Sequence, residues 1–137
     1  MGKIAYSYST TLPLTLTEAE KVVLQALKKE QFGIISEIDI QAKLKEKLAI
    51  DHPPHKILGA CNPQLAYQAL QDNADVALAL PCNVVLREES GHTIVTALFP
   101  SVALQPFAGI KVQESSCKAE EALGRVFDDL SHSHPSS

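Results

Sequence analysis

Two short segments near the middle of the chain carry the residues that could do chemistry. Gly59–Pro63 reads GACNP and Leu80–Val84 reads LPCNV, so each segment places a Cys-Asn pair beside a proline. Thiols bind soft metals or react as nucleophiles, and amide side chains hydrogen-bond small ligands. If folding brings the two segments together, these side chains share one cavity. The sequence therefore predicts a ligand pocket lined by Cys61, Asn62, Cys82 and Asn83.

Cys61 is the strongest single candidate for a reactive group. Asn62 is a favoured N-cap residue and Pro63 a favoured first helical residue, so a helix should begin directly after the thiol. The positive end of a helix stabilises a thiolate and can lower the pKa of a cysteine. Cys61 would then serve a thiol-dependent enzyme or a redox sensor. The alternative is a small buried side chain that ends a strand.

Cys82 and Asn83 follow Pro81 in a segment with core-like neighbours. Cys82 could form a redox pair with Cys61, or the two sulfurs could hold a soft metal together with a histidine. It could equally be a packed core thiol. Asparagine is depleted in strands, so Asn83 is either a structural hydrogen-bond bridge or part of the pocket.

Asp39 adds a carboxylate to the candidate set. It precedes an apolar stripe of Ile40, Leu44 and Leu48 at helical spacing, which favours a role as the N-cap of a second helix. The alternative is a base or ligand that faces the same pocket as the Cys-Asn pairs.

The other residues with reactive or metal-binding side chains have simpler explanations. Cys117 lies away from the apolar centre of its helix and is expected to be partly exposed. His52 and His55 flank two prolines, and a solvated loop explains them better than a metal site. Glu88 and Glu89 are typical of the solvent-facing residues of a hairpin. No nucleotide-binding loop or metal-spacing motif is present, so the sequence identifies no cofactor.

Composition and charge restrict the class of protein. The 137 residues are 45% hydrophobic and 20% charged, which is typical of one globular domain. The formal net charge of −4 disfavours nucleic acid and anionic membranes as partners, because both require a basic surface. No apolar run reaches bilayer-spanning length and no signal-peptide pattern is seen. We therefore expect a cytoplasmic protein whose three cysteines stay reduced.

Apolar periodicity, caps and turns predict the order β-α-β-α-β-α-β-β-α. Strands are expected at residues 3–9, 34–38, 56–61, 76–87 and 92–99. Helices are expected to start at a capping box over 17–20, at 39, at 63 and near 111. The first helix should bury Ala19, Val23, Ala26 and Leu27. We predict one α+β domain over 1–130, in which helices pack against a mixed or antiparallel five-stranded sheet, and a flexible C-terminal tail over 131–137.

Three motifs in order resemble the signatures of the domain of unknown function 302 family. They are FGIISEID at 32–39, KILGACNP at 56–63 and LPCNVV at 80–85. The resemblance covers nearly the whole chain and implies a TATA-binding-protein-like α+β fold in a single decorated copy. It also implies pairing as a homodimer. It implies no particular activity, and the DNA-binding role of the fold's namesake does not follow from the fold.

Three functions from different classes follow. The main hypothesis is a small-molecule or metal-binding module with its pocket near the two Cys-Asn pairs. The second is a thiol-dependent enzyme or redox sensor that uses Cys61. The third is a dimeric interaction protein whose cysteines only pack.

Overall fold

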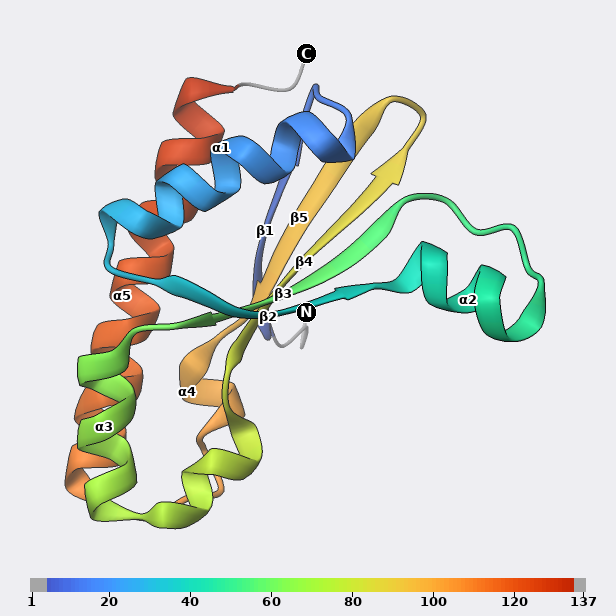
Figure 1. Cartoon of the computed structure of the whole chain (residues 1–137). Helices are drawn as coiled ribbons and strands as arrows, with labels where there is room; N and C mark the ends of the chain where they lie inside the picture. The colour runs from blue at the N-terminus through green and yellow to red at the C-terminus, as the bar shows by residue number, and fades with distance from the viewer. Residues whose placement is uncertain (1–4, 135–137) are drawn as a thin grey trace.

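An antiparallel sheet of five strands forms the centre of the fold in the computed structural model, which describes residues 5–134 (Figure 1). The spatial order is β1-β5-β4-β3-β2, and every neighbouring pair is antiparallel. The strands are β1 (Ser7–Leu12), β2 (Gly33–Asp39), β3 (His55–Cys61), β4 (Cys82–Glu89) and β5 (His92–Leu98). The predicted α+β class, strand number and element order are confirmed, and the sheet is the antiparallel alternative.

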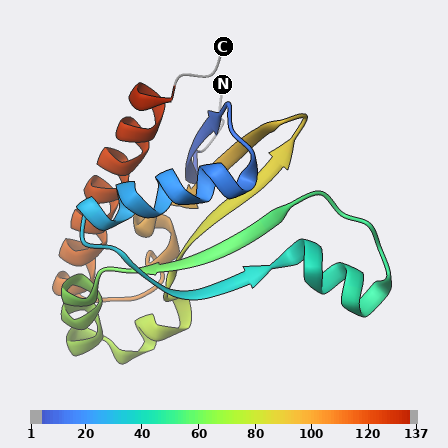
Figure 2. The same cartoon turned by 45° about the horizontal axis from the view of Figure 1, so that its top comes forward.

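Most of the helices gather on one face of this sheet. They are α1 (Leu16–Lys29), α2 (Ile40–Leu48), α3 (Pro63–Asp72), the 3₁₀ helix η1 (Ala74–Ala79), α4 (Pro100–Ala103) and α5 (Ile110–Ser133). Helices α1 and α5 lie together against the sheet, and α3 packs beside α5 (Figures 1 and 2). Helix α2 lies beyond the end of β2, apart from the other helices, in both views. The opposite face of the sheet is open.

The covered face of the sheet forms the main core. Strand register places Tyr8, Ala97, Val84 and Leu58 in one row across four strands. Helices α1 and α5 bury this row with aliphatic side chains such as Leu27 and Leu123, both 0% exposed. Each such side chain contributes about 1.5–3 kcal/mol by leaving water. The predicted inward face of α1 is confirmed, because all four of its members are buried: Ala19, Val23, Ala26 and Leu27.

One predicted strand is wrong in its first half. Residues 74–79 form η1, and β4 begins only at Cys82. Asn73 starts η1 because its side chain accepts a hydrogen bond from the amide of Asp75 at 3.0 Å. Pro81 has no amide hydrogen for a sheet ladder, so the strand starts after it.

The two ends of the fold also differ from the predicted boundaries. Strand β1 starts at Ser7, and Lys3 and Ile4 of the expected strand lie outside the described residues. Helix α5 continues to Ser133 instead of ending near Leu130, because its backbone hydrogen bonds continue through the start of the expected tail. Residues 135–137 of that tail lie outside the described part of the chain.

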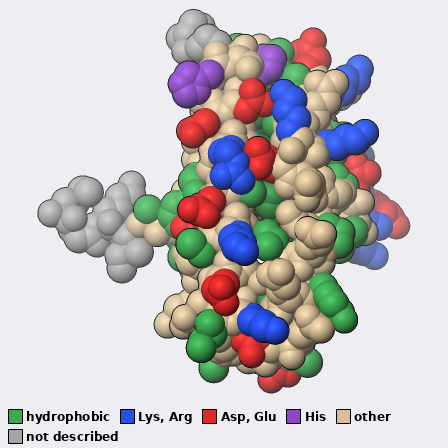
Figure 3. All heavy atoms as spheres, turned by 90° about the vertical axis from the view of Figure 1, so that its left-hand side faces the viewer, with side chains coloured by type: hydrophobic (Ala, Val, Ile, Leu, Met, Phe, Trp, Pro, Cys, Tyr) green, Lys and Arg blue, Asp and Glu red, His purple; other side chains and the backbone are tan. Residues whose placement is uncertain are grey.

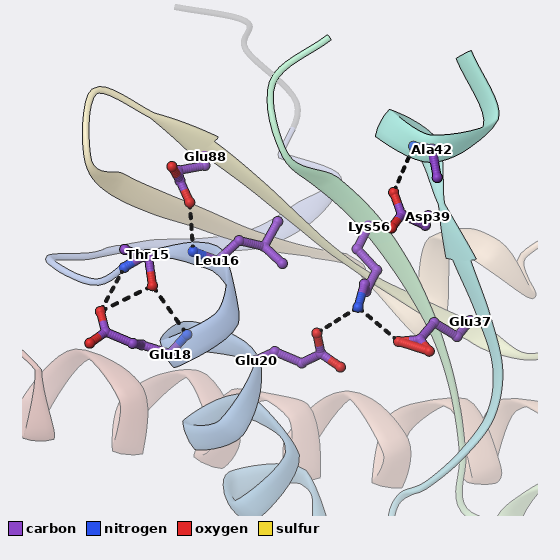
Figure 4. A network of polar contacts seen from close by, with 9 residues as sticks. All are labelled: Thr15, Leu16, Glu18, Glu20, Glu37, Asp39, Ala42, Lys56 and Glu88. Atoms are coloured by element: carbon purple, nitrogen blue, oxygen red, sulfur yellow. Dashed lines mark hydrogen bonds and ion pairs between the residues drawn. The ribbon is translucent and has the colours of Figure 1, made fainter. Parts of the chain in front are cut away.

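The capping box of α1 is shifted from its predicted place. The hydroxyl of Thr15 accepts a hydrogen bond from the amide of Glu18 at 3.3 Å, and the Glu18 carboxylate accepts from the Thr15 amide at 3.0 Å (Figure 4). The box expected over 17–20 is therefore wrong. Its glutamate, Glu20, instead accepts from the Lys56 ammonium at 2.8 Å. The chain offers two overlapping Thr-x-x-Glu sequences, at 15–18 and 17–20. Only the first forms the capping box, because Lys56 of β3 engages the glutamate of the second.

Polar contacts fix the start of α1 to the sheet (Figure 4). Lys56 lies between the carboxylates of Glu20 and Glu37, with nitrogen–oxygen distances of 2.8 and 2.9 Å. The hydrogen bond to Glu20, followed by the contacts with Glu37, raises the pKa of Lys56 although burial opposes the shift. Glu88 accepts a hydrogen bond from the amide of Leu16 at 2.7 Å. Glu88 is therefore a structural acceptor, not the solvent-facing hairpin residue that was expected.

The outer surface of the helical layer carries both signs of charge. Acidic and basic side chains alternate over this face, which Figure 3 shows from the side of the helices. Arg125 pairs with Glu30 at 3.0 Å and Lys29 with Asp129 at 3.5 Å, so both pairs join α1 to α5. Exposed pairs of this kind contribute little to stability, and hydrophobic burial remains the main attachment. Among the helices within residues 5–134, none has the length and hydropathy that a bilayer span requires.

Candidate functional site

A narrow crevice lies where the ends of β3 and β4 meet α3, α4 and α5. The residues that line it come from every one of these elements and from the segments beside them. They are Phe32, Ala60, Cys61, Asn62, Leu65, Ala66, Ala69, Ala79, Leu80, Cys82, Pro100, Ala103, Leu104, Ser115, Ser116 and Ala119. Three of the predicted site residues, Cys61, Asn62 and Cys82, are therefore brought to one cavity.

Strand pairing explains why the two cysteines meet. Cys61 is the last residue of β3, and Cys82 is the first residue of β4. Antiparallel pairing places Cys82 opposite Ala60, the residue directly before Cys61. The end of one strand therefore lies beside the start of the next, and both thiols reach the crevice.

Gly59 allows the strands to close tightly next to this crevice. A Cβ atom at this position would lie 2.8 Å from Cγ of Pro81 and would also overlap the Ser36 hydroxyl. A side chain there would require the Ser36 side chain and the rigid Pro81 ring to move, which explains the glycine two residues before Cys61.

The crevice is small and mainly apolar. Its empty volume, including the open mouth, is about 480 Å³. Most of this volume belongs to the open mouth, and the enclosed part has room for roughly three water molecules. The hydroxyl of Ser116 donates to the carbonyl of Gln113 at 2.9 Å, and that of Ser115 to Gln68 at 3.4 Å. These donors are already engaged, so the lining presents little free polarity.

Burial keeps both thiols of the crevice protonated at neutral pH. It raises the pKa of Cys82 to about 11, and the nearby Cys61 adds to the shift. Burial also raises the pKa of Cys61. This direction is opposite to the lowering expected from a helix start after Asn62, and its cause is desolvation of the thiolate by burial. The crevice is therefore uncharged.

Asn62 lines the crevice but also has a structural role. Its side-chain oxygen accepts a hydrogen bond from the amide of Leu65 at 3.3 Å and caps α3, with Pro63 in the first turn. The predicted N-cap is confirmed. Its amide group is positioned by this cap at the edge of the cavity.

Two other candidate residues lie elsewhere. Asn83 pairs opposite Gly59 and is exposed on the open face of the sheet, because its side chain alternates with that of Cys82. Asp39 ends β2, whereas Gly33 at the other end of that strand pairs with Cys61. The Asp39 carboxylate accepts from the amide of Ala42 at 2.9 Å and caps α2 (Figure 4). Neither side chain lines the crevice.

In the part of the chain that the structure describes, the two crevice cysteines belong to no metal-binding cluster. Within residues 5–134, no group of three or more His, Cys, Asp and Glu side chains is arranged to hold a metal ion. Cys117 is exposed on α5 and does not line the crevice.

The walls of the crevice contain residues that the sequence did not single out. Phe32, Leu80 and Leu104 are apolar side chains that look like ordinary core residues in the sequence. Ser115 and Ser116 are buried in α5 at 3% and 7% exposure. Two adjacent buried serines in a helix are a local signal that could have indicated this part of the wall.

Comparisons with known proteins agree with the fold. A family model described as "Domain of unknown function DUF302" matches residues 8–130. The crystal structure of an uncharacterised conserved DUF302 protein from Bacillus stearothermophilus is 27% identical, with a TM-score of 0.84. The match covers 93% of this chain and 99% of that chain. A search of curated proteins gives no match.

Proposed function

Because this chain belongs to the DUF302 family, whose description names no activity, we propose its function from geometry: it binds a small, neutral, apolar molecule in the crevice. The observation that carries the proposal is the meeting of two protonated thiols and the Asn62 side-chain amide in a mainly apolar cavity. Apolar pockets with a few convergent polar groups are the usual form of small-molecule sites.

The electrostatics of the crevice select the charge of the ligand. Protonated thiols are weak hydrogen-bond donors and carry no charge, and among residues 5–134 no Lys, Arg, Asp or Glu lines the cavity. An anion or cation would lose its hydration without gaining a partner. A neutral ligand of a few heavy atoms avoids this cost and gains the dispersion contacts of the alanine and leucine walls.

Xenon and acetate are suitable probes of these properties. In methyl-labelled protein, dissolved xenon should shift the methyl signals of Leu65, Leu80 and Leu104 in a saturable way, whereas acetate at the same concentration should not. The Leu48 methyls on α2 serve as the internal control. Equal responses to both probes, or no response to xenon, would contradict the proposal.

A filled-crevice variant tests the same site from the protein side. Ala66→Leu places a larger side chain in the cavity wall and should abolish the xenon shifts. Ala42→Leu on the exposed surface of α2 is the matched control and should retain them. Backbone amide spectra of both variants establish that the fold is intact. Persistent xenon shifts in folded Ala66→Leu would place binding elsewhere.

A homodimer formed through the open face of the sheet is the second candidate function. Register places Ile38, Ile57 and Val85 in one row on this face, and Ile38 is 47% exposed. Helix α2 buries none of its residues, and Leu48 is 61% exposed. A second copy would cover both apolar surfaces at once in a symmetric arrangement.

Sedimentation equilibrium tests this dimer. Ile38→Glu should shift the protein towards the monomer, because it places a charge in the centre of the proposed interface. Ile110→Glu is the matched control, since Ile110 is 76% exposed at the start of α5, away from that face. A wild-type chain that stays monomeric at high micromolar concentration would rule out this candidate.

The thiol-dependent alternative has less support than the other two. A nucleophilic cysteine requires a lowered pKa, whereas burial raises the pKa of Cys61. The three free cysteines, Cys61, Cys82 and Cys117, agree with a reducing cytoplasmic location, which stays part of the proposal. No nucleic-acid partner is proposed.

A further inference from the structure

Two histidines lie side by side where the connection after α2 enters β3: His52 belongs to the connection and His55 is the first residue of the strand. Nε2 of His52 and Nδ1 of His55 are 3.1 Å apart, a hydrogen-bonding distance. The ring centres are 5.3 Å apart and the ring planes differ by 15°. The distance between the ring centres is close to the nitrogen–nitrogen distance plus the two distances from a ring centre to its nitrogen. The two rings therefore meet edge to edge and do not overlap. The result is a near-linear N–H···N hydrogen bond.

This hydrogen bond links a residue that contacts α2, His52, to a residue that belongs to the sheet, His55. The carbonyl of His52 accepts from the Gln41 side chain on α2 at 3.0 Å. His55 is the first residue of β3 and pairs across the sheet with Arg87. The carbonyl of Pro54 accepts from a β4 amide at 3.0 Å, which fixes the sheet side of the connection.

We propose that the His52–His55 hydrogen bond is a pH-sensitive switch that sets how firmly α2 is attached to the sheet. With two neutral rings, one nitrogen donates and the other accepts. With one added proton, an imidazolium donates to a neutral imidazole and the bond strengthens. With both rings protonated, each nitrogen carries a hydrogen, so the bond breaks and the two cations repel.

The surrounding charges favour opening of the pair at acid pH. Arg87 on β4 brings a positive charge to His55, and burial with the charges of His52 and Arg87 lowers the pKa of His55. The nearby acids are engaged by other cations: Glu89 contacts Arg87, and Asp51 pairs with Lys45 of α2 at 2.9 Å. A second proton on the pair therefore has no free carboxylate to stabilise it among these groups.

Helix α2 is the element that such a switch can move. It has no fully buried residue, and only Ile40 and Leu44 are half-buried, so the polar contacts of its ends and connection form an important part of its attachment. Elements with little buried apolar surface open locally at low free-energy cost. Loss of the histidine hydrogen bond should therefore loosen α2 while the core formed by α1 and α5 stays intact. The inference depends neither on ligand binding in the crevice nor on a dimer.

Amide hydrogen exchange of the full chain at low micromolar concentration tests the switch. After correction for intrinsic exchange rates, protection of the α2 amides should fall about tenfold or more between about pH 7 and about pH 5. The α5 amides should keep their protection over this range. In His52→Asn, which retains an amide partner for His55 but cannot be protonated, α2 protection should change less than about twofold.

His92→Asn in the β4–β5 hairpin is the matched control and should behave as the wild type. Nitrogen-15 spectra of the wild-type rings give a second measurement that needs no variant. The His52–His55 pair should take up its second proton below the pKa of about 6.5 of an unfolded-chain histidine. A pH-independent α2 in the wild type, an equal fall in His52→Asn, or two independent ordinary titrations would each overturn the proposal.

Discussion

Helices α1 and α2 begin in the same way and end in opposite environments. Each follows a strand, and each is capped by a side chain that accepts from the helix's own backbone, Thr15 in α1 and Asp39 in α2. Five residues of α1 are buried, whereas α2 buries none. Caps and apolar periodicity therefore specify where a helix forms. The tertiary partner alone decides whether its apolar stripe leaves water.

The same contrast divides the sheet. Its covered face meets α1 and α5, whereas the other face has no helix packed over it (Figure 2). Register places the apolar residues Ile38, Ile57 and Val85 in one row on that open face. The crevice lies at the end of the covered side, where α3 and α4 complete the wall. Helix α2 extends from the end of β2 and lies apart from the helices of the covered side. Substitutions of buried residues on the covered side should therefore change the free energy of unfolding strongly, and substitutions on the open side or in α2 only weakly.

Two leucine substitutions test this division most directly. Leu27→Ala in α1 should lower the free energy of unfolding by about 2–5 kcal/mol, because it leaves a cavity at a side chain that is 0% exposed. Leu48→Ala in α2 should change it by no more than about 0.5 kcal/mol, since that side chain is 61% exposed. Urea denaturation at low protein concentration measures both. Comparable losses would show that α2 is part of the cooperative core.

Alkaline pH should reveal burial at the crevice. The pKa of Cys82 is raised from 9.0 to about 11, so the unfolded chain loses this proton first as pH rises. The contribution of the buried, neutral Cys82 thiol to the free energy of unfolding is fully present below about pH 9. It is lost towards about pH 11, and its magnitude is roughly 2–3 kcal/mol. Denaturation curves of the wild type, Cys82→Ser and Cys117→Ser between these pH values measure it.

Cys82→Ser should lose this part of the pH dependence. Cys117→Ser is the control, because Cys117 is exposed, and it should keep the wild-type slope. Identical slopes for the wild type and Cys82→Ser would mean that the thiol is hydrated in solution.

Substitutions of the caps should have the smallest effects and should separate the two helices. Thr15→Ala should cost about 1 kcal/mol of global stability, because α1 is part of the core. Thr17→Ala, in the unused frame, should cost only a few tenths of a kcal/mol. Asp39→Ala should reduce hydrogen-exchange protection of α2 with little change in global unfolding. A larger global loss for Thr17→Ala than for Thr15→Ala would reverse the assignment of the capping box.

Local signals were sufficient for much of the fold. Asn62 before Pro63 indicated the start of α3, and Asp39 before an apolar stripe indicated the start of α2. The frame of the α1 capping box could not be chosen locally, because Lys56 engages Glu20 from β3. The segment before Pro81 has strand-like composition, yet the cap at Asn73 makes it a 3₁₀ helix.

The candidate site was less accessible from the sequence than the fold. The matched Cys-Asn pairs suggested four equivalent groups, but side chains alternate along a strand, so Cys82 faces the crevice and Asn83 the open face. The pKa of Cys61 depends on walls supplied by α3, α4 and α5, which only the tertiary structure assembles. Sequence patterns identify the reactive atoms, and packing determines their protonation.

The hydrogen bond between Leu16 and Glu88 has a consequence for the length of the β4–β5 hairpin. It joins residues 72 positions apart, and its acceptor is reached only if Glu88 points to the helical side of the sheet. Inserting one residue between Arg87 and Glu88 would turn this side chain to the other side. The first turn of α1 would then lose its acceptor, although the insertion lies in a different part of the sequence.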